Sequence, residues 1–334
     1  MTHDSTSSGS ASTPSSASSP AHPSPERTAA GVPRPGGAGQ LAGHTVSRIG
    51  YGAMQLERLH GDRAAAVALL RRAVELGVDH VDTAQFYGDG LVNDLIREAI
   101  RPEDGVVVSS KVGADPDPGG RIPLRPAQRP DELRASVEDN LRGLGIEQVP
   151  VVNLRRMDTR PGLLAEGDQA VDVDDQLAVM TALRDEGKIG AIGLSSVTLD
   201  VLRRALPAGI VCVQNSYSLV SRKDEEMLDL CVAEGIAWVP FFPLGGAFPG
   251  MPKVTDEPAL LAAAAAVGAT PSQVGLAWQL RHAPNTLLIP GTGDAGHLAE
   301  NVAAGALALD GALDDAVLAT LDAVPSRSAD VSLA

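Results

Sequence analysis

Four side chains that could together support a proton transfer lie where short apolar segments of the sequence end. The segment VDHVDTAQFYG carries Asp82 and Tyr87, VVVSSKVG carries Lys111, and VPVVNLRRMD carries Arg155. A tyrosine is a poor acid near neutral pH unless a neighbouring cation stabilises its phenolate. A lysine about 4 Å away supplies on the order of 4 kcal/mol of attraction at an effective dielectric constant of about 20. With an aspartate orienting that lysine, the set predicts a general acid that protonates a carbonyl oxygen while hydride reaches the carbon.

These side chains can meet only if the fold brings distant strand ends together. Short runs rich in Val and Ile alternate with segments of helical period, such as DRAAAVALLRRAVELG, which is typical of βα units around a parallel sheet. We expect eight strands, near residues 46–53, 78–83, 106–111, 149–154, 189–195, 210–215, 236–241 and 286–290. Eight units predict a single-domain α/β fold, the (β/α)8 TIM barrel, whose strand ends converge on one rim. An open doubly wound sheet is the alternative, but no G-x-G-x-x-G opens the first helix after a strand.

Composition limits the partners. The formal net charge of −15 argues against nucleic acid and anionic membranes, and no run of about 20 apolar residues predicts a membrane span. The two cysteines, Cys212 and Cys231, lie in apolar segments, which indicates core positions in a reducing, cytoplasmic setting rather than a disulfide framework. The seven histidines are scattered, so we expect no metal site.

The composition also divides the chain into regions. Residues 1–38 are rich in Ser, Ala, Pro, Thr and Gly and predict a disordered tail, because such a segment buries too little apolar surface to offset the entropy of ordering. A phosphorylated or partner-binding arm is the alternative interpretation. We expect the barrel over residues 39–326 and a short C-terminal tail over 327–334.

With these residues in place, the sequence resembles the aldo-keto reductase family from about Val46 to Val324. VDHVDTAQFYG and SSKVG resemble its signatures for the acid and the lysine, and IPGTGDAGHLAEN resembles its cofactor signature. VSRIGYGAM, GLSS, VQNSYSL and FFPLGG follow in the family's order. The resemblance implies a (β/α)8 barrel that binds NADPH without a glycine fingerprint, with Tyr87 as the acid and with Lys111 and Asp82 tuning it. The NLRRMD segment resembles a bacterial, pyridoxal-reductase-like branch.

The resemblance also implies a set of cofactor-binding residues along the strand ends. They are Gly52, Ala53 and Met54 under the nicotinamide; Ser195, Ser196 and Gln214 at its carboxamide; Phe241 stacked on its face; Pro243, Leu244, Gly245 and Gly246 near the pyrophosphate; and Gly291, Thr292, Gly293, His297, Glu300 and Asn301 toward the adenosine. The family usually has Asn at position 196. Its strongly NADPH-selective members carry cations at positions 291 and 297, so NADPH is favoured here and NADH is possible.

Arg155 stands where the family typically has a histidine that points at the substrate carbonyl. An arginine keeps its charge and can stabilise an oxyanion, and it suits a substrate with an anionic oxygen beside the aldehyde, such as pyridoxal. Alternatively, Arg155 turns away to pair with a carboxylate such as Asp158. We expect an enzyme acting on a small carbonyl substrate, as a monomer or small homo-oligomer. A cofactor-sensing or partner-binding barrel with little turnover remains the alternative function, and an isomerase is a weaker one.

Overall fold

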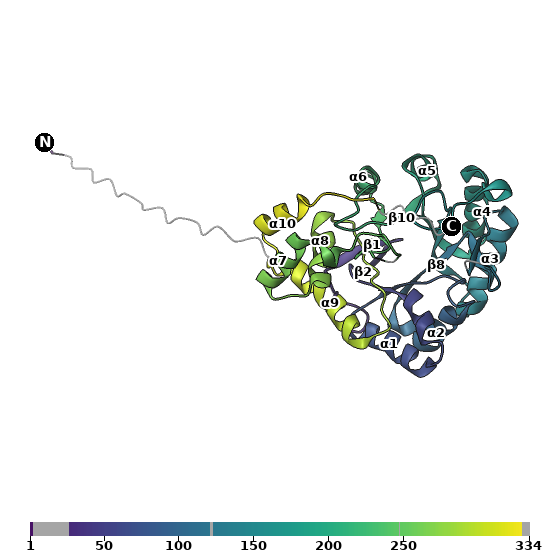
Figure 1. Cartoon of the computed structure of the whole chain (residues 1–334), viewed down its shortest axis with the longest axis horizontal. Coiled ribbons are helices and arrows are strands. Elements are labelled where there is room, and N and C mark those ends of the chain that lie inside the picture. Colours follow the sequence, from purple (N-terminus) through teal and green to yellow (C-terminus); the bar gives the residue numbers. More distant parts are fainter. Residues whose placement is uncertain (3–26, 121–122, 247, 329–334) are drawn as a thin grey trace.

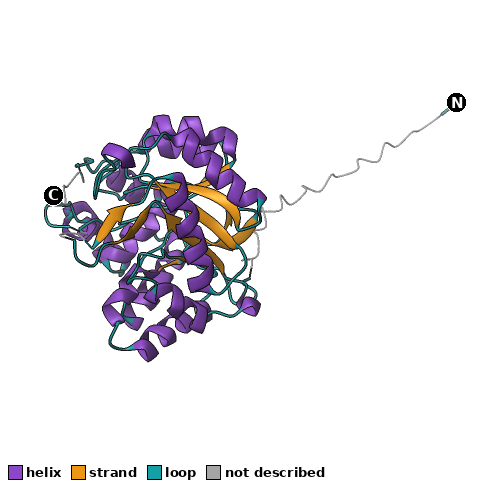
Figure 2. Cartoon of the chain, turned by 90° about the vertical axis from the view of Figure 1, so that its right-hand side faces the viewer, coloured by secondary structure: helices purple, strands orange, loops and turns teal. Residues whose placement is uncertain are grey.

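A curled sheet of seven parallel strands forms the centre of the protein. The computed structural model describes residues 1–2, 27–120, 123–246 and 248–328. The strands are adjacent in chain order: β3 (Tyr51–Gly52), β4 (His80–Asp82), β5 (Val107–Val112), β8 (Val149–Arg155), β9 (Ile189–Ser195), β10 (Ile210–Gln214) and β11 (Ala237–Trp238). Figures 1 and 2 show the helices arranged around this sheet.

The eighth predicted strand, 286–290, closes the sheet through isolated bridges. Leu288 donates its N–H to the Arg48 carbonyl and accepts from Gly50, both at 2.8 Å, while Leu287 donates to Trp238 at 2.8 Å. The bridges to both neighbours are parallel. Because the adjoining strands β3 and β11 are only two residues long, the segment pairs at single positions and forms no regular strand. The predicted (β/α)8 barrel is confirmed, with its last strand reduced to these contacts.

Ten α-helices cover the described part of the chain. They are α1 (Arg63–Glu75), α2 (Leu91–Ala99), α3 (Pro130–Leu144), α4 (Val173–Asp185), α5 (Leu199–Ala205), α6 (Glu225–Ala233), α7 (Pro258–Val267), α8 (Pro271–His282), α9 (Ala295–Leu309) and α10 (Asp315–Asp322). Side-chain caps begin several of them; the Asp62 carboxylate accepts from Ala65 N–H before α1 at 3.0 Å. Among the described helices none is by itself long and apolar enough to span a membrane; α7 and α8 pass only as a pair, and they are bent by 97°.

The other four strands of the described chain form two short hairpins. β1 (Ala38–Leu41) and β2 (His44–Ser47) pair antiparallel, so the strand predicted over 46–53 is divided between this hairpin and β3. Leu41 and Val46 of the hairpin pack with Val107 and Val151, the first inward residues of their strands, and thereby close the N-terminal end of the barrel. β6 (Ala114–Pro116) and β7 (Leu124–Pro126) form the second hairpin, between β5 and α3.

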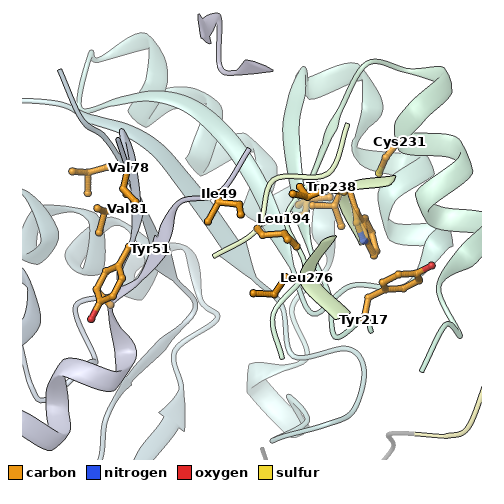
Figure 3. Packing of buried hydrophobic residues seen from close by; sticks show 14 of the residues in the cluster. Ile49, Tyr51, Val78, Val81, Leu194, Tyr217, Cys231, Trp238 and Leu276 are labelled. Atoms are coloured by element: carbon orange, nitrogen blue, oxygen red, sulfur yellow. The ribbon is translucent and has the colours of Figure 1, made fainter. Parts of the chain in front are cut away.

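The barrel interior becomes more polar from its N-terminal to its C-terminal end. Above Val107 and Val151, Asn153 donates its side-chain N–H to the Ser109 hydroxyl at 2.8 Å. Residues two positions apart on a strand share a face, so Lys111 and Arg155 follow at the C-terminal rim. The largest buried apolar cluster lies instead outside the sheet, where Figure 3 shows Tyr51 near Val81 and Tyr217 near Trp238. The rings of Tyr217 and Trp238 meet edge to face at 5.7 Å.

Residues 27–38, which belong to the predicted N-terminal tail, contact the barrel. Arg34 donates to the Asp79 carboxylate at 2.9 Å, and Ile49 N–H donates to the Pro35 carbonyl at 3.1 Å. A Cβ on Gly305 of α9 would lie 2.2 Å from the Gly36 nitrogen, so this segment sits directly on the helix. Residues 27–38 are therefore packed where the sequence predicts a disordered tail; residues 3–26 and 329–334 lie outside the described chain.

Gly305→Ala tests this packing, because helix propensity and the contact predict opposite signs. Propensity alone would raise the free energy of unfolding by about 1 kcal/mol. The backbone of Pro35 and Gly36 leaves no room for the methyl group, so we expect a decrease of about 1–3 kcal/mol in urea denaturation. Ala306→Gly on the exposed side of α9 calibrates the propensity effect. A stabilised Gly305→Ala would contradict the packing.

Candidate active site

A buried ion pair stands at the C-terminal end of the barrel. The Lys111 ammonium donates to one carboxylate oxygen of Asp82, and only 6% and 5% of the two side chains are exposed. The same ammonium donates to the Thr83 carbonyl at 3.1 Å and lies 5.0 Å from the centroid of the Tyr87 ring. The structure therefore brings Asp82, Lys111 and Tyr87 together.

The surroundings determine the charge of Lys111. Burial acts to lower the pKa of its ammonium, but attraction to Asp82 and Tyr87, with hydrogen bonds to both, outweighs burial and raises the pKa. A raised pKa keeps the lysine protonated at neutral pH. The Lys111 ammonium therefore places a permanent positive charge close to the Tyr87 ring, where it attracts negative charge.

Arg155 lies at the same rim, without an ion pair among the described residues. Its guanidinium carbon is 5.7 Å from the centroid of the Phe86 ring, and its Nε is buried with no hydrogen-bond partner in the described chain. Burial lowers the pKa of Arg155, and Tyr87 opposes this shift. A buried guanidinium with an unused donor is suited to an anionic ligand oxygen.

The neighbouring Arg156, rather than Arg155, pairs with Asp158. Arg156 donates to the two carboxylate oxygens at 2.7 and 3.2 Å and also to the side chain of Gln176. The alternative in which Asp158 draws Arg155 out of the site is therefore wrong. Gln128 holds the Arg155 backbone instead, donating to its carbonyl at 2.7 Å.

The predicted carboxamide-binding residues lie at the ends of β9 and β10. Gln214 donates its side-chain N–H to the second Asp82 oxygen at 2.6 Å, while its own Oε1 is buried without a partner in the described chain. Ser195 is buried, and Ser196 adopts φ 54°, a left-handed conformation that asparagine tolerates better than serine. Phe241, after β11, is half-buried.

Close glycine contacts shape the two cofactor segments predicted on either side of the closure. A Cβ on Gly52 would lie 2.5 Å from the Ile289 carbonyl oxygen, and a Cβ on Gly291 would lie 2.5 Å from the Gly52 oxygen. Tyr51 donates its hydroxyl to the Thr292 carbonyl at 2.5 Å. The backbone of β3 and of residues 289–292 can therefore touch only because both positions are glycine.

The other predicted cofactor residues line the rim or the start of α9. Ala53 is buried and Met54 exposed at the start of the 3₁₀ helix η1 (Ala53–Leu59); Pro243, Leu244, Gly245 and Gly246 are half-buried; Gly293, His297 and Glu300 are exposed, Asn301 is half-buried and Thr292 is buried. The Asp294 carboxylate caps α9 by accepting from His297 N–H at 2.9 Å. This acidic cap, which the cofactor signature did not predict, occupies an N–H donor expected to face an anion.

Comparison with known proteins identifies the family of the chain. A family model described as the Aldo/keto reductase family matches residues 48–324. The chain belongs to the aldo/keto reductase family. Membership confirms the resemblance in the sequence and the expectation of an oxidoreductase acting on carbonyl or alcohol groups.

Individual proteins that are similar to this chain agree with the family assignment. The chain is 43% identical to pyridoxine 4-dehydrogenase of Escherichia coli (strain K12) over 291 residues, or 85% of this chain and 96% of that protein. It is 34% identical to an uncharacterized oxidoreductase of Schizosaccharomyces pombe, covering 79% and 83%. Among solved structures, an aldo-keto reductase from Klebsiella pneumoniae in complex with NADPH matches with a TM-score of 0.70 and 25% identity, over 87% of this chain and 96% of that one.

No group of three or more His, Cys, Asp or Glu side chains is placed to hold a metal ion within the ranges that the structure describes. Asp82, Tyr87, Lys111 and Arg155 fall within the part of the chain that the family model matches.

Asp82→Asn tests the buried ion pair. The uncompensated lysine should lower the free energy of unfolding by about 3–5 kcal/mol at pH 7, whereas Asp82→Asn combined with Lys111→Met should recover much of the loss. Because the folded pKa of Lys111 is raised, its contribution is complete below the ordinary value of 10.5 and is lost as the pH rises through the folded value.

Asp82→Asn removes the attraction and the hydrogen bond to Asp82, so we expect burial to outweigh the remaining attraction to Tyr87 and to lower the pKa of Lys111. The variant should then regain stability as the pH rises toward 10.5. Urea denaturation between pH 7 and 11 should therefore show the difference from the wild type narrowing. If Asp82→Asn and the double variant Asp82→Asn/Lys111→Met lose the same free energy of unfolding, attraction between Asp82 and Lys111 contributes nothing to stability.

Proposed function

We propose that the protein reduces a small aldehyde or ketone with NADPH, with Tyr87 as the general acid. The observation that supports this most strongly is the Lys111 ammonium, held by Asp82 and placed 5.0 Å from the centre of the Tyr87 ring. As the carbonyl carbon is reduced, the phenol gives its proton to the oxygen, and the ammonium stabilises the phenolate left behind. Arg155 polarises the carbonyl in place of the family's histidine.

Several features of the site fit NADPH as the cofactor. Gln214 Oε1, which has no partner among the described residues, can accept from the nicotinamide amide, and the half-buried Phe241 supplies an aromatic ring for stacking. NADPH, when bound, supplies the hydride. The NADPH complex of the Klebsiella relative supports the same choice. Asp294, at the start of α9, places a negative charge near the expected 2′-phosphate, so NADH remains a possible second cofactor.

Within this reaction we propose pyridoxal as a substrate. Its aldehyde has a phenolate oxygen on the adjacent ring carbon, and the Arg155 guanidinium, whose Nε has no partner in the described part of the chain, offers donors to such an oxygen. The similarity to a protein named pyridoxine 4-dehydrogenase supports this choice, because that name describes the reverse reaction.

The two free cysteines, both buried, are consistent with a cytoplasmic enzyme.

Tyr87→Phe tests the assigned acid. Removing the hydroxyl should lower kcat for pyridoxal by about 10²–10⁴-fold, because the proton loses its donor. The dissociation constant for NADPH, measured by fluorescence, should stay within about twofold. Retention of full turnover would refute the acid. Wild-type protein that binds NADPH but reduces no aldehyde in a broad panel would favour the cofactor-sensing alternative.

Arg155→Met tests the anion-recognising role with a matched substrate pair. Salicylaldehyde carries an oxygen beside its aldehyde and benzaldehyde does not. Loss of a charged hydrogen bond should reduce kcat/KM for salicylaldehyde and pyridoxal about 10–100-fold more than for benzaldehyde. Arg156→Met, which removes the partner of Asp158, should leave that ratio unchanged. Equal losses on both aldehydes in Arg155→Met would limit the arginine to the carbonyl.

A further inference from the structure

Two buried asparagines lie behind the site and have no role in the mechanism above. Asn93 is on α2 and Asn140 on α3, and both are fully buried. The amide N–H of Asn93 donates to Asn140 Oδ1 at 3.1 Å, which joins the two helices. We call this pair the amide bridge. Amides in an apolar setting are costly unless all their groups are bonded, so their partners indicate what they hold.

Asn93 holds the segment that carries the tyrosine. Its Oδ1 accepts from the Thr83 hydroxyl at 2.8 Å, and its amide N–H donates to Gln85 Oε1 at 2.7 Å. Thr83 and Gln85 lie between Asp82 and Tyr87 in the sequence. The carbonyl of Thr83 is also a direct acceptor for the Lys111 ammonium. Asn93 is therefore bonded to Thr83, whose carbonyl accepts from Lys111, and to the segment that leads to Tyr87.

Asn140 holds the strand that carries the lysine. Its Oδ1 accepts from the Ser110 hydroxyl at 2.5 Å, and its amide N–H donates to the Lys111 carbonyl at 3.4 Å and to the Ser136 carbonyl at 2.8 Å. The neighbouring Gly143 permits this close packing, because a Cβ there would lie 2.8 Å from Gln85 Oε1. The amide bridge thus connects the two segments whose separation sets the distance from Lys111 to Tyr87.

We propose that Asn93 and Asn140 are positioning residues that hold the Lys111 ammonium against the Tyr87 hydroxyl. This proposal rests on the proposed function for its kinetic consequence and on geometry alone for its electrostatic one. The bridge fixes the Thr83 carbonyl, which orients the ammonium, and the Lys111 backbone, from which the side chain extends. Loosening either end lengthens the contact between cation and phenol and makes the phenolate harder to form.

Asn93→Asp preserves the shape of the side chain but adds a carboxylate that itself disfavours a nearby phenolate, so the uncharged Thr83→Val variant described below decides the cause of any shift. The new oxygen meets Gln85 Oε1 and Asn140 Oδ1, two acceptors, so both hydrogen bonds are lost. We expect kcat to fall at least about tenfold, with the dissociation constant for NADPH within about twofold. The alkaline limb of the kcat/KM profile should move up by about half a pH unit.

Thr83→Val provides a milder variant that removes only the hydroxyl bonded to Asn93, and it should produce a smaller change in the same direction. Asn285→Asp is the matched control. Its amide N–H donates to the Ile236 carbonyl at the N-terminal end of the barrel, at 2.7 Å, so kcat per folded molecule and the pH profile should not change.

An alkaline absorbance titration of tyrosine gives a measurement independent of turnover. The chain has three tyrosines, and burial raises the pKa of Tyr51 and of Tyr217, so these two ionise late. The difference between each protein and its Tyr87→Phe counterpart isolates the Tyr87 signal. In Asn93→Asp and Thr83→Val that signal should move to higher pH than in the wild-type background.

The outcomes separate this proposal from the proposed function. An unshifted Tyr87 signal in Asn93→Asp, or unchanged kcat in both variants, would overturn the positioning role and leave the amides purely structural. A shifted signal in a protein whose wild type reduces no aldehyde would support the positioning role and refute the proposed function. If Asn93→Asp does not fold, Thr83→Val decides both measurements.

Discussion

The site depends on one constraint: a lysine is kept charged inside the barrel. Burying an ammonium is unfavourable unless a carboxylate and further acceptors surround it. Asp82 supplies the carboxylate, Gln214 fixes the other oxygen of that carboxylate, and Thr83 supplies a carbonyl. Asp82 and Thr83 lie at the end of β4, Lys111 lies on the neighbouring β5, and Gln214 lies on β10, so the complete set of bonds needs strands that are not neighbours in the sheet. Fold and electrostatics are therefore coupled at this point.

The barrel meets this constraint through the order of its interior side chains. Valines lie at the end closed by the β1–β2 hairpin, hydroxyl and amide groups occupy the middle, and the Lys111–Asp82 ion pair lies at the open rim. Apolar side chains exclude water at the N-terminal end of the barrel, whereas charged side chains at the rim need polar partners around them. The close contact between Gly52 and Gly291 also shapes this rim, because it places the predicted cofactor segments in backbone contact there.

Much of this arrangement could be predicted from sequence, because strand ends in a closed parallel sheet share a rim. That rule brings Asp82, Tyr87, Lys111 and Arg155 together without any coordinates. Other features depend on contacts that periodicity does not encode. The alanine-rich α7 has no clear polar face, the hairpin divides the first predicted strand, and Asn93 and Asn140 occupy helices whose pattern indicates only a buried face. Which of two adjacent arginines would pair with Asp158 also required the structure.

The central claim is that the Tyr87 hydroxyl and the Lys111 ammonium face a bound nicotinamide. A crystal structure of the protein with NADP⁺ and pyridoxine tests it most directly. The account predicts the pyridoxine alcohol oxygen within about 2.6–3.2 Å of the Tyr87 hydroxyl, with the nicotinamide ring carbon about 3–3.5 Å from the alcohol carbon. A dinucleotide bound elsewhere, or an alcohol oxygen out of reach of Tyr87, would contradict it.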